Sequence, residues 1–430
     1  MRSLARARAF LCLGLLLASM SASLSLADQG TSVPQDLPGL STLPHAQASG
    51  VTGHPLRFLQ PDPSGVTRLF PQDTFIRVHG WVDSGYTFNT ASPSSHFNGP
   101  YNAIDRDIGQ FNQFYLTLEK PLADRSRGWD IGGRVDLLWG YDYFLPQSNG
   151  LELRDDGSPH WNEGQYGLAI PQAYVEMGHS TLSLKVGHFY TIIGYEGVPA
   201  LINFFYSKAY SYQFAGPFTH WGGLATWSID KRWSLQGGVV NGWNALDRVH
   251  NQGAILGKVN YTADNNLWSA SFGLITGNEP TGTADNFDNR TRISAIVTVH
   301  PFDRLEYVFH HFYAFQKDGR MGGGTARWYG IDQYLYYTLT NRWRAGLRVE
   351  WFRDEEGTRV GGAPDRGNVN LAPFPGSFYS ISAGLNYLPH PNVLIRPEIR
   401  SDWFDGNGQP YNDRTDKQQY LVAVNANLQF

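Results

Sequence analysis

The last eleven residues of the chain alternate between apolar and polar positions. One parity holds Tyr420, Val422, Val424, Ala426, Leu428 and Phe430, and the other holds Ala423, Asn425, Asn427 and Gln429, with Leu421 as the exception. A period of two predicts a strand with one apolar face and one wet face. Because this strand ends the chain on an aromatic residue, it favours the closing strand of a membrane barrel over an edge strand of a soluble sandwich.

The composition agrees with a barrel that sits in a membrane. Aromatic residues make up 14% of the 430 residues, charged residues only 17%, and the formal net charge is −4. Such a chain is too polar for a bundle of membrane helices, and its aromatic side chains need interfaces. No linker divides it, so we expect one large unit. No basic stretch suggests nucleic acid as a partner.

The amino-terminal residues predict export from the cytoplasm. Three arginines lie in the first eight residues, an apolar stretch too short to span a bilayer follows at 9–18, and small residues follow at 25–27. We therefore predict a signal peptide over residues 1–27, cut after Ala27. The single cysteine, Cys12, lies inside it, so the mature chain is expected to contain no disulfide and no cysteine metal site.

Residues 28–73 contain seven prolines and show no sustained period. This composition predicts an irregular, proline-rich periplasmic extension that acts as a tether. The barrel is expected to occupy residues 74–430.

Alternating segments fill the rest of the chain. We count sixteen, beginning near residues 75, 111, 129, 169, 181, 220, 232, 253, 266, 291, 304, 326, 342, 377, 392 and 418. Short turns alternate with long connections, which cover residues 90–109, 142–167, 191–219, 243–251, 277–290, 316–325, 354–376 and 404–416. This order predicts an all-β fold: a transmembrane antiparallel β-barrel of about sixteen strands, with short periplasmic turns and long extracellular loops.

Tryptophans mark both ends of the apolar face in two of these segments. Trp129 and Trp139 are ten residues apart, which spans roughly 23 Å at the usual strand tilt and matches the height of the apolar band in such barrels. Trp343 and Trp351 repeat this arrangement. We predict that these four tryptophans and Phe430 form an aromatic girdle.

Charged residues occupy the opposite parity of the same strands and of the fifteenth. We expect this set to line the pore: Arg134, Asp136, Arg342, Arg344, Arg348, Glu350, Arg396, Glu398, Arg400 and Asp402. A surplus of arginine on the thirteenth and fifteenth strands predicts a weak anion preference that fades with salt. Alternatively, these arginines pair with the acids and brace the wall, and the sequence leaves both interpretations open.

Several stretches also carry a resemblance to a known family. They are Gly80-Trp81-Val82-Asp83-Ser84-Gly85-Tyr86, Asp105-Arg106-Asp107 followed by Leu118-Glu119-Lys120-Pro121, the stretch from Leu184 through Gly194-Tyr195-Glu196 to Pro217-Phe218-Thr219-His220, and Ile395-Arg396-Pro397-Glu398-Ile399-Arg400. With them the chain resembles the OmpL-like putative beta-barrel porins over roughly residues 74–430. The resemblance implies an outer-membrane porin fold, but it supplies no substrate and no catalytic residues. The proline-rich extension departs from the family.

No catalytic, cofactor or metal site is predicted. His310 and His311 are adjacent in a strand and point to opposite faces, so they cannot bind one metal together. Acids in the loops lack the ligand series of a calcium loop, namely Asp105 and Asp107, Asp155 and Asp156, and Asp285 with Asp288. We find no Gly-x-Ser-x-Gly or His-Glu-x-x-His motif.

The connection at residues 192–219 is unusually apolar and aromatic, so it is not expected to extend freely into water. It could fold into the barrel and narrow the pore, pack over the rim, or pack against another protomer. The loop at 142–167, with Glu152, Asp155, Asp156 and Glu163, is the charged alternative for a constriction.

A barrel of about sixteen strands is wide enough for an aqueous lumen, so we expect passive diffusion of small hydrophilic solutes or ions without a cofactor. A structural or adhesive barrel closed by its loops is the alternative, and a barrel-borne hydrolase is a weaker one. The expected partners are outer-membrane lipid and lipopolysaccharide, the barrel-assembly machinery through the C-terminal strand and, by analogy, two further copies of the chain in a homotrimer.

Overall fold

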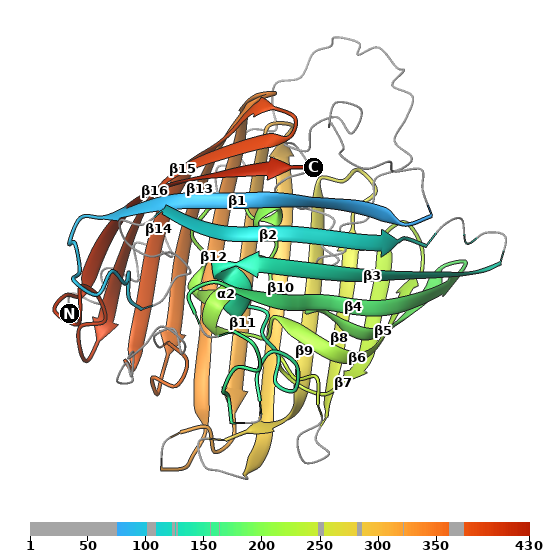
Figure 1. Cartoon of the computed structure of the whole chain (residues 1–430), viewed down its shortest axis with the longest axis horizontal. Helices are drawn as coiled ribbons and strands as arrows, with labels where there is room; N and C mark the ends of the chain where they lie inside the picture. The colour runs from blue at the N-terminus through green and yellow to red at the C-terminus, as the bar shows by residue number, and fades with distance from the viewer. Residues whose placement is uncertain are drawn as a thin grey trace, which may run out of the picture. The chain divides into compact units, whose positions relative to one another are not determined.

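The computed structural model describes residues 75–100, 109–122, 125, 128–154, 156–162, 164–247, 253–281, 286–320, 322–360 and 374–430. The predicted signal peptide and the proline-rich extension lie outside these residues. The described residues form sixteen strands in a closed antiparallel barrel, in which β1 pairs with both β2 and β16 (Figure 1). No helix among them is long and apolar enough to cross a membrane.

The predicted strand positions are confirmed. The largest difference is at β10, which begins at residue 287 instead of 291. The strands are β1 (Arg77–Asn89), β2 (Gly109–Lys120), β3 (Trp129–Gly140), β4 (Gly167–His179), β5 (Leu182–Tyr190), β6 (Thr219–Ser228), β7 (Trp233–Val240), β8 (Ala254–Thr262), β9 (Trp268–Pro280), β10 (Phe287–Phe302), β11 (Leu305–Gln316), β12 (Ala326–Thr340), β13 (Trp343–Asp354), β14 (Gly376–His390), β15 (Val393–Gly406) and β16 (Gln418–Gln429).

The loop expected at 277–290 is shorter than predicted. The two flanking strands continue past their apolar stretch, and the ladder reaches the pair Phe287 and Pro280. Polar residues such as Asn278 and Asn289 face each other in this extension. Backbone pairing therefore continues where the hydrophobic alternation has already stopped, and only residues 281–286 remain as the connection.

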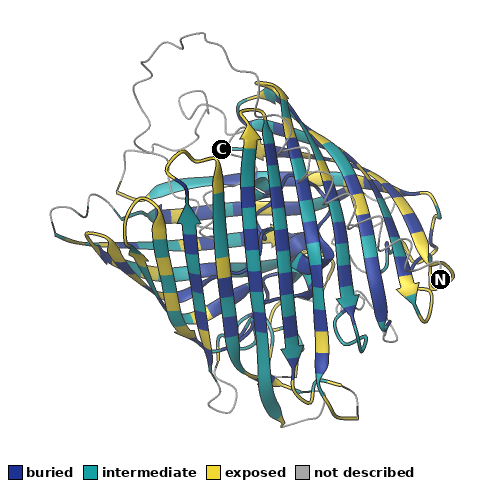
Figure 2. Cartoon of the chain, turned by 180° about the vertical axis from the view of Figure 1, so that it is seen from behind, coloured by how far each residue is buried: buried dark blue, intermediate teal, exposed yellow. Residues whose placement is uncertain are grey.

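Side chains alternate between the lumen and the outer surface along the strands. Buried and more exposed residues alternate along the strands that Figure 2 shows. On β16, Leu421 is 2% exposed whereas Val422 is 49% exposed, and the alternation continues along the strand. Outward-facing apolar residues such as Val175, Ile255 and Ile399 are more than half exposed. An apolar outer face with a polar inner one is the arrangement that a lipid bilayer requires of a barrel.

The last residue closes the barrel. The backbone N–H of Phe430 donates to the carbonyl of Gly80 at 3.0 Å, and the N–H of Gly80 donates back at 3.1 Å. The Phe430 ring stacks on Phe114, with 6.1 Å between the ring centroids. A side chain at Gly80 would stand 2.8 Å from Cζ of the Phe430 ring, so this glycine makes room for the terminal aromatic residue.

Residues 191–218, which connect β5 to β6, form the inner segment. It contains a short 3-10 helix, η5 (Ala200–Ile202), and one turn of α-helix, α2 (Tyr210–Phe214). The close approach of α2 to β12 and β13, and its place within the ring of strands in Figure 1, put the segment inside the barrel. Of the three arrangements considered for this stretch, the structure shows the one in which it folds into the barrel.

Candidate functional site

The inner segment leaves the wall and returns to it at one point. The N–H of Thr191 donates to the carbonyl of Phe218 at 2.9 Å, so the two ends of the segment are joined. The side-chain oxygen of Asn244 accepts from the N–H groups of Phe218 and Thr219 at 2.7 and 3.0 Å. The segment is thus a closed excursion into the lumen from the end of β5.

Three consecutive aromatic residues at 204–206 attach the segment to the opposite wall. A Cβ atom placed on Gly346 of β13 would lie 2.3 Å from Cε1 of Phe204. The next two rings lie over Gly384 of β14 and Gly85 of β1, at 3.3 and 2.5 Å from the corresponding Cβ positions. These three glycines face the lumen, and we call them the glycine sockets. A side chain at any of the three positions would crowd the ring that lies over it.

Arg348 of β13 connects the inner segment to the wall through charge. Its Nη1 atom lies 2.8 Å from Oε1 of Glu196 and donates to the carbonyl of Ser207 at 2.9 Å. Its Nη2 atom donates to the hydroxyl of Ser207 at 2.7 Å. The N–H of Ser207 in turn donates to Glu398 of β15 at 2.9 Å. Both buried wall charges, Arg348 and Glu398, are therefore bonded to the inner segment.

Two arginines of β15 hold backbone carbonyls of the segment. Arg396 donates to the carbonyls of Ala200 and Asn203 at 2.8 and 2.7 Å. Arg400 donates to the carbonyl of Lys208 at 2.9 Å. Arginine suits this role because one guanidinium offers several donors in a fixed geometry.

Carboxylates anchor the helical turn of the segment. Glu350 accepts from the N–H of Tyr210 at 2.7 Å, and Asp402 accepts from the Tyr210 hydroxyl at 3.1 Å. The same hydroxyl lies 2.9 Å from the hydroxyl of Tyr411, in the connection between β15 and β16. The first turn of α2 is therefore tied to the walls of β13 and β15 and to a loop.

The predicted pore-lining residues point inward in most cases, and they are paired. Arg344 contacts Glu306 at 2.9 Å, and Arg134 contacts Asp136 at 2.8 Å. Arg342 is placed elsewhere, in the exposed turn before β13. On the described strands, the bracing interpretation of these arginines thus has direct geometric support.

A linear network of polar side chains crosses three neighbouring strands. The hydroxyl of Ser294 on β10 lies 2.9 Å from Nε2 of His310 on β11, and Nδ1 of His310 lies 2.8 Å from Asp332 on β12. Ser211 of the inner segment donates to the same carboxylate. The connectivity is that of a hydrolase triad. However, Ser294 is only 3% exposed, so the network instead joins the wall to the segment.

His311 does not take part in that network. Its Nδ1 lies 3.0 Å from the carbonyl of Gly330, and it has the opposite burial parity to His310. Within the described part of the chain, no group of three or more His, Cys, Asp or Glu residues could hold a metal ion. Four of the loop acids considered above lie outside that part, namely Asp105, Asp107, Asp155 and Asp285, as does Glu163.

The described part of the connection at 141–166 packs against its own strands and against the connection after β7, where the N–H of Asn149 donates to the carbonyl of Asn244 at 2.8 Å. It begins with the 3-10 helix η4 (Tyr141–Phe144). Glu152 accepts from the N–H groups of Ser148 and Ile170 at 3.0 and 2.8 Å. Burial raises the pKa of the Glu152 carboxyl, and these two donors oppose that rise. The charge of Glu152 thus serves to shape the loop.

The residues predicted for the aromatic girdle have aromatic or polar neighbours at the outer surface. Trp129 and Trp139 are 68% and 46% exposed. Trp343 stacks on Tyr387 with 4.1 Å between ring centroids, and the indole N–H of Trp351 donates to Ser377 at 3.2 Å.

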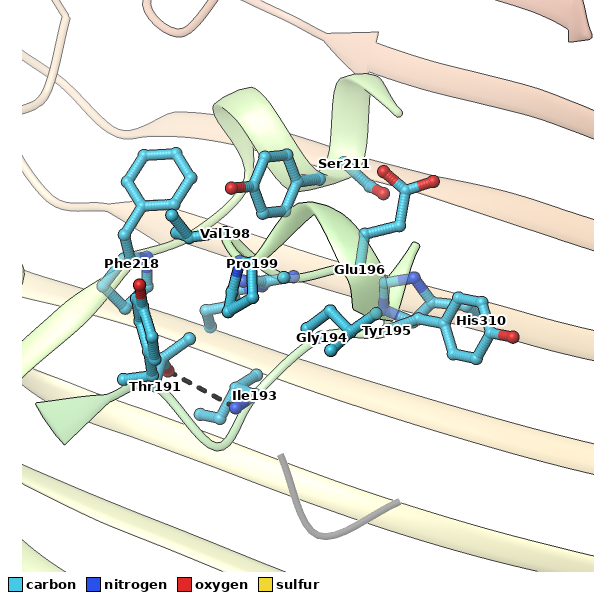
Figure 3. Close-up of a pocket in the computed structure, with 16 residues that line it drawn as sticks. Thr191, Ile193, Gly194, Tyr195, Glu196, Val198, Pro199, Ser211, Phe218 and His310 are labelled. Carbon is cyan, nitrogen blue, oxygen red and sulfur yellow. Dashed lines mark hydrogen bonds between the residues drawn. The ribbon is translucent and has the colours of Figure 1, made fainter. Parts of the chain in front are cut away.

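A cavity of about 30 Å³ lies between the inner segment and the wall of β10 and β11. Figure 3 shows it between Thr191, Gly194 and Glu196 of the segment, with Ser211 and His310 beside it. Arg292 of β10 also lines it. Sequence reasoning missed this cavity and the glycine sockets, although the parity of Gly346 and Gly384 would have placed both glycines on the lumen side.

The comparisons with known proteins agree on the architecture. The sequence matches the family model described as putative beta-barrel porin-2, OmpL-like, over residues 75–430. No curated protein matches the chain.

Solved structures share the fold at low sequence identity. The outer membrane channel DcaP of Acinetobacter baumannii is 13% identical, with a TM-score of 0.56 over 83% of this chain and 97% of that one. The anion-selective porin from Comamonas acidovorans is 12% identical, with a TM-score of 0.56 over 83% and 99%. OmpT of Vibrio cholerae, in its trimer form, is 9% identical, with a TM-score of 0.55 over 83% and 99%.

Proposed function

Since this chain belongs to the putative beta-barrel porin-2, OmpL-like family, an outer-membrane porin family, we propose that it carries small hydrophilic solutes by passive diffusion past the inner segment. Movement down a gradient needs no cofactor and no catalytic group. The solute is one that fits between the segment and the strand wall.

The polarity of the inward face is the observation that carries this proposal. On β14 the lumen-facing residues include Ser380, Ser382 and Asn386, and on β16 they include Asn425 and Asn427. A barrel that served only as a scaffold could fill its interior with apolar side chains, which avoid the cost of burying polar groups. A polar inner wall around a lumen of sixteen strands instead suits water and dissolved solutes.

The second candidate is a structural or adhesive barrel that is closed by its loops. The observation in its favour is the inner segment, whose residues Glu196, Ser207 and Tyr210 are all bonded to the far wall. The two candidates differ in whether ions pass while this segment is docked.

Recordings in planar bilayers separate them. The purified full chain should give discrete conductance steps, and a variant in which residues 194–215 are replaced by a short Gly-Ser turn should give steps several times larger. The excision is feasible because Thr191 and Phe218 already meet at 2.9 Å. Steps only in the excised variant would support the closed barrel, and steps in neither would refute the porin proposal.

The outer surface and the C-terminal strand of the barrel would meet the membrane partners. Lipid and lipopolysaccharide would cover the apolar outer face, with Trp129, Trp139, Trp343, Trp351 and Phe430 at its borders. The C-terminal strand would be recognised by the barrel-assembly machinery. A homotrimer is supported by analogy with the trimer form of OmpT, and chemical crosslinking in native membranes would test it. We assign no catalytic role.

A further inference from the structure

Arg292 differs from the arginines that hold the inner segment. Its side chain points into the lumen from β10 and is 3% exposed. It makes no hydrogen bond or ion pair with any described residue, and its Nε atom is buried without a partner. Its guanidinium lies 5.7 Å from the centroid of the Phe312 ring. A buried guanidinium without a carboxylate partner is costly unless something else compensates its charge.

The inner segment is shaped to admit this guanidinium. A Cβ atom on Gly216 would lie 1.6 Å from Nη1 of Arg292, where no atom could fit. A Cβ atom on Gly194 would lie 3.5 Å from Nη2, and the φ of +107° at Gly194 is one that other residues rarely adopt. The guanidinium therefore passes between two glycines near the two ends of the segment.

Arg292 also lines the cavity of about 30 Å³. The cavity is lined as well by Gly194, Glu196, Ser211 and His310, which Figure 3 labels. A water molecule needs roughly 10–15 Å³ of such volume, so the cavity admits about two atoms of that size. That is the size of the two oxygens of a carboxylate group, and a carboxylate is the group that an arginine fork binds with two parallel hydrogen bonds.

The acids near Arg292 are already engaged. Glu196 contacts Arg348 at 2.8 Å and accepts from the Tyr334 hydroxyl at 3.2 Å and the Ala209 N–H at 2.9 Å. The Asp332 carboxylate accepts from Ser211 and contacts His310. Among the described residues, neither carboxylate lies within ion-pair distance of Arg292, so the guanidinium donors of Arg292 are left for a ligand.

We propose that Arg292 and this cavity form a subsite for the carboxylate group of a small organic anion on its way through the lumen. The inference rests on the proposed porin function for how the anion arrives. Binding of the anion to the subsite does not require conduction. The subsite and the proposed porin function can therefore be refuted separately.

Binding is measured first, with acetate as the probe and the folded full chain in detergent, by saturation-transfer NMR. The Arg292→Gln variant should bind acetate on the order of tenfold more weakly, as expected when a charge-assisted pair is lost. The matched control is Lys258→Gln on β8, which removes another inward basic side chain that is 5% exposed and has no hydrogen-bond partner among the described residues. It should change acetate binding less than about twofold, because Lys258 does not line the cavity and acts on a bound anion only through screened, long-range charge.

A second variant keeps the charge and removes the geometry. Gly216→Ala places a methyl group where Nη1 of Arg292 lies, so acetate binding should fall as in Arg292→Gln. Wild-type binding in both variants, or equal losses in Arg292→Gln and Lys258→Gln, would overturn the subsite. If chloride competed for the subsite as strongly as acetate binds to it, the carboxylate assignment would be overturned. A single anionic atom would then be enough for binding.

Bilayer recordings in chloride and in acetate separate this inference from the function. Channel steps with acetate-dependent block that Arg292→Gln abolishes support both. Channel steps with no acetate binding in solution leave the porin and refute the subsite. Acetate binding without any channel steps refutes passive diffusion and retains the subsite.

Discussion

The Nη1 atom of Arg348 and the Oε1 atom of Glu196 lie 2.8 Å apart, and their side chains are 0% and 5% exposed. This ion pair joins β13 to a segment that begins at the far end of β5. Glu350 lies 2.8 Å from Nε of the same arginine, and Glu398 lies 3.8 Å from its Nη2. Arg348 therefore contacts three carboxylates, one of which, Glu350, also lies 3.4 Å from Nη1 of Arg400.

Removing Arg348 should cost more than removing Glu196. In Arg348→Gln three buried carboxylates lose their common partner, and we expect a loss of roughly 3–5 kcal/mol in the free energy of unfolding. Glu196→Gln leaves Arg348 paired with Glu350 and should cost less. Urea unfolding in lipid vesicles, followed by tryptophan fluorescence, measures both.

The control for this comparison is Arg327→Gln. Arg327 is 45% exposed and lies 3.8 Å from its acidic partners, so its removal should cost no more than about 1 kcal/mol. Equal losses in all three variants would mean that the inner cluster does not stabilise the barrel specifically.

Filling a glycine socket should loosen the inner segment. The methyl group of Gly346→Ala would stand 2.3 Å from Phe204, which forces the ring to move and should cost about 1–3 kcal/mol. We expect faster cleavage of the segment by protease and more frequent large conductance steps. Gly237→Ala is the matched control, because nothing lies within 4 Å of that Cβ position. If both alanine variants resist protease as the wild type does, the sockets do not hold the segment.

Deleting Phe430 should impair closure of the barrel. The deletion removes two backbone hydrogen bonds to Gly80 and the contact with Phe114. We expect less folded protein in the outer membrane, measured by heat-modifiable migration on gels. Refolding of the same variant from urea into detergent separates the two causes. Normal refolding in detergent would place the defect in recognition by the assembly machinery, and normal yields in cells would contradict both.

The amino-terminal prediction is tested by intact mass. Cleavage after Ala27 gives a mature chain that begins at Asp28, and a chain that lacks residues 28–73 as well should still fold and conduct. A mass that retains residues 1–27 would show that the signal peptide stays attached. Failure of the shorter chain to fold would give the extension a role beyond that of a tether.

The wall of the barrel could be predicted from the sequence because successive residues of a strand face opposite sides of the sheet. Apolar and polar residues therefore alternate with a period of two. The inward positions of Arg344, Arg348, Arg396 and Arg400 followed from that parity alone. Their partners did not follow from it, because Arg348 meets Glu196 across 152 residues of sequence. No local pattern encodes a contact of that range.

The interior was harder to predict for a related reason. A glycine on an inward parity is compatible with a gap, a bend or a socket, and only the path of the inner segment decides among them. The aromatic character of residues 204–206 indicated burial. It did not indicate that Gly346, Gly384 and Gly85 would receive the rings.

The contacts of the inner segment also set an order for the steps of barrel assembly. It is synthesised before β10–β16, yet Ser207 bonds to a residue 191 positions later and Ala200 accepts from one 196 positions later. Contacts of such long range form slowly, because the chain between them must be ordered first. Until β13 and β14 arrive, Phe204 and Phe205 lack the glycines on which they dock and stay available to the chaperones that hold unfinished chains. The inner segment therefore docks late in assembly, after the strands that carry its binding partners have joined the wall.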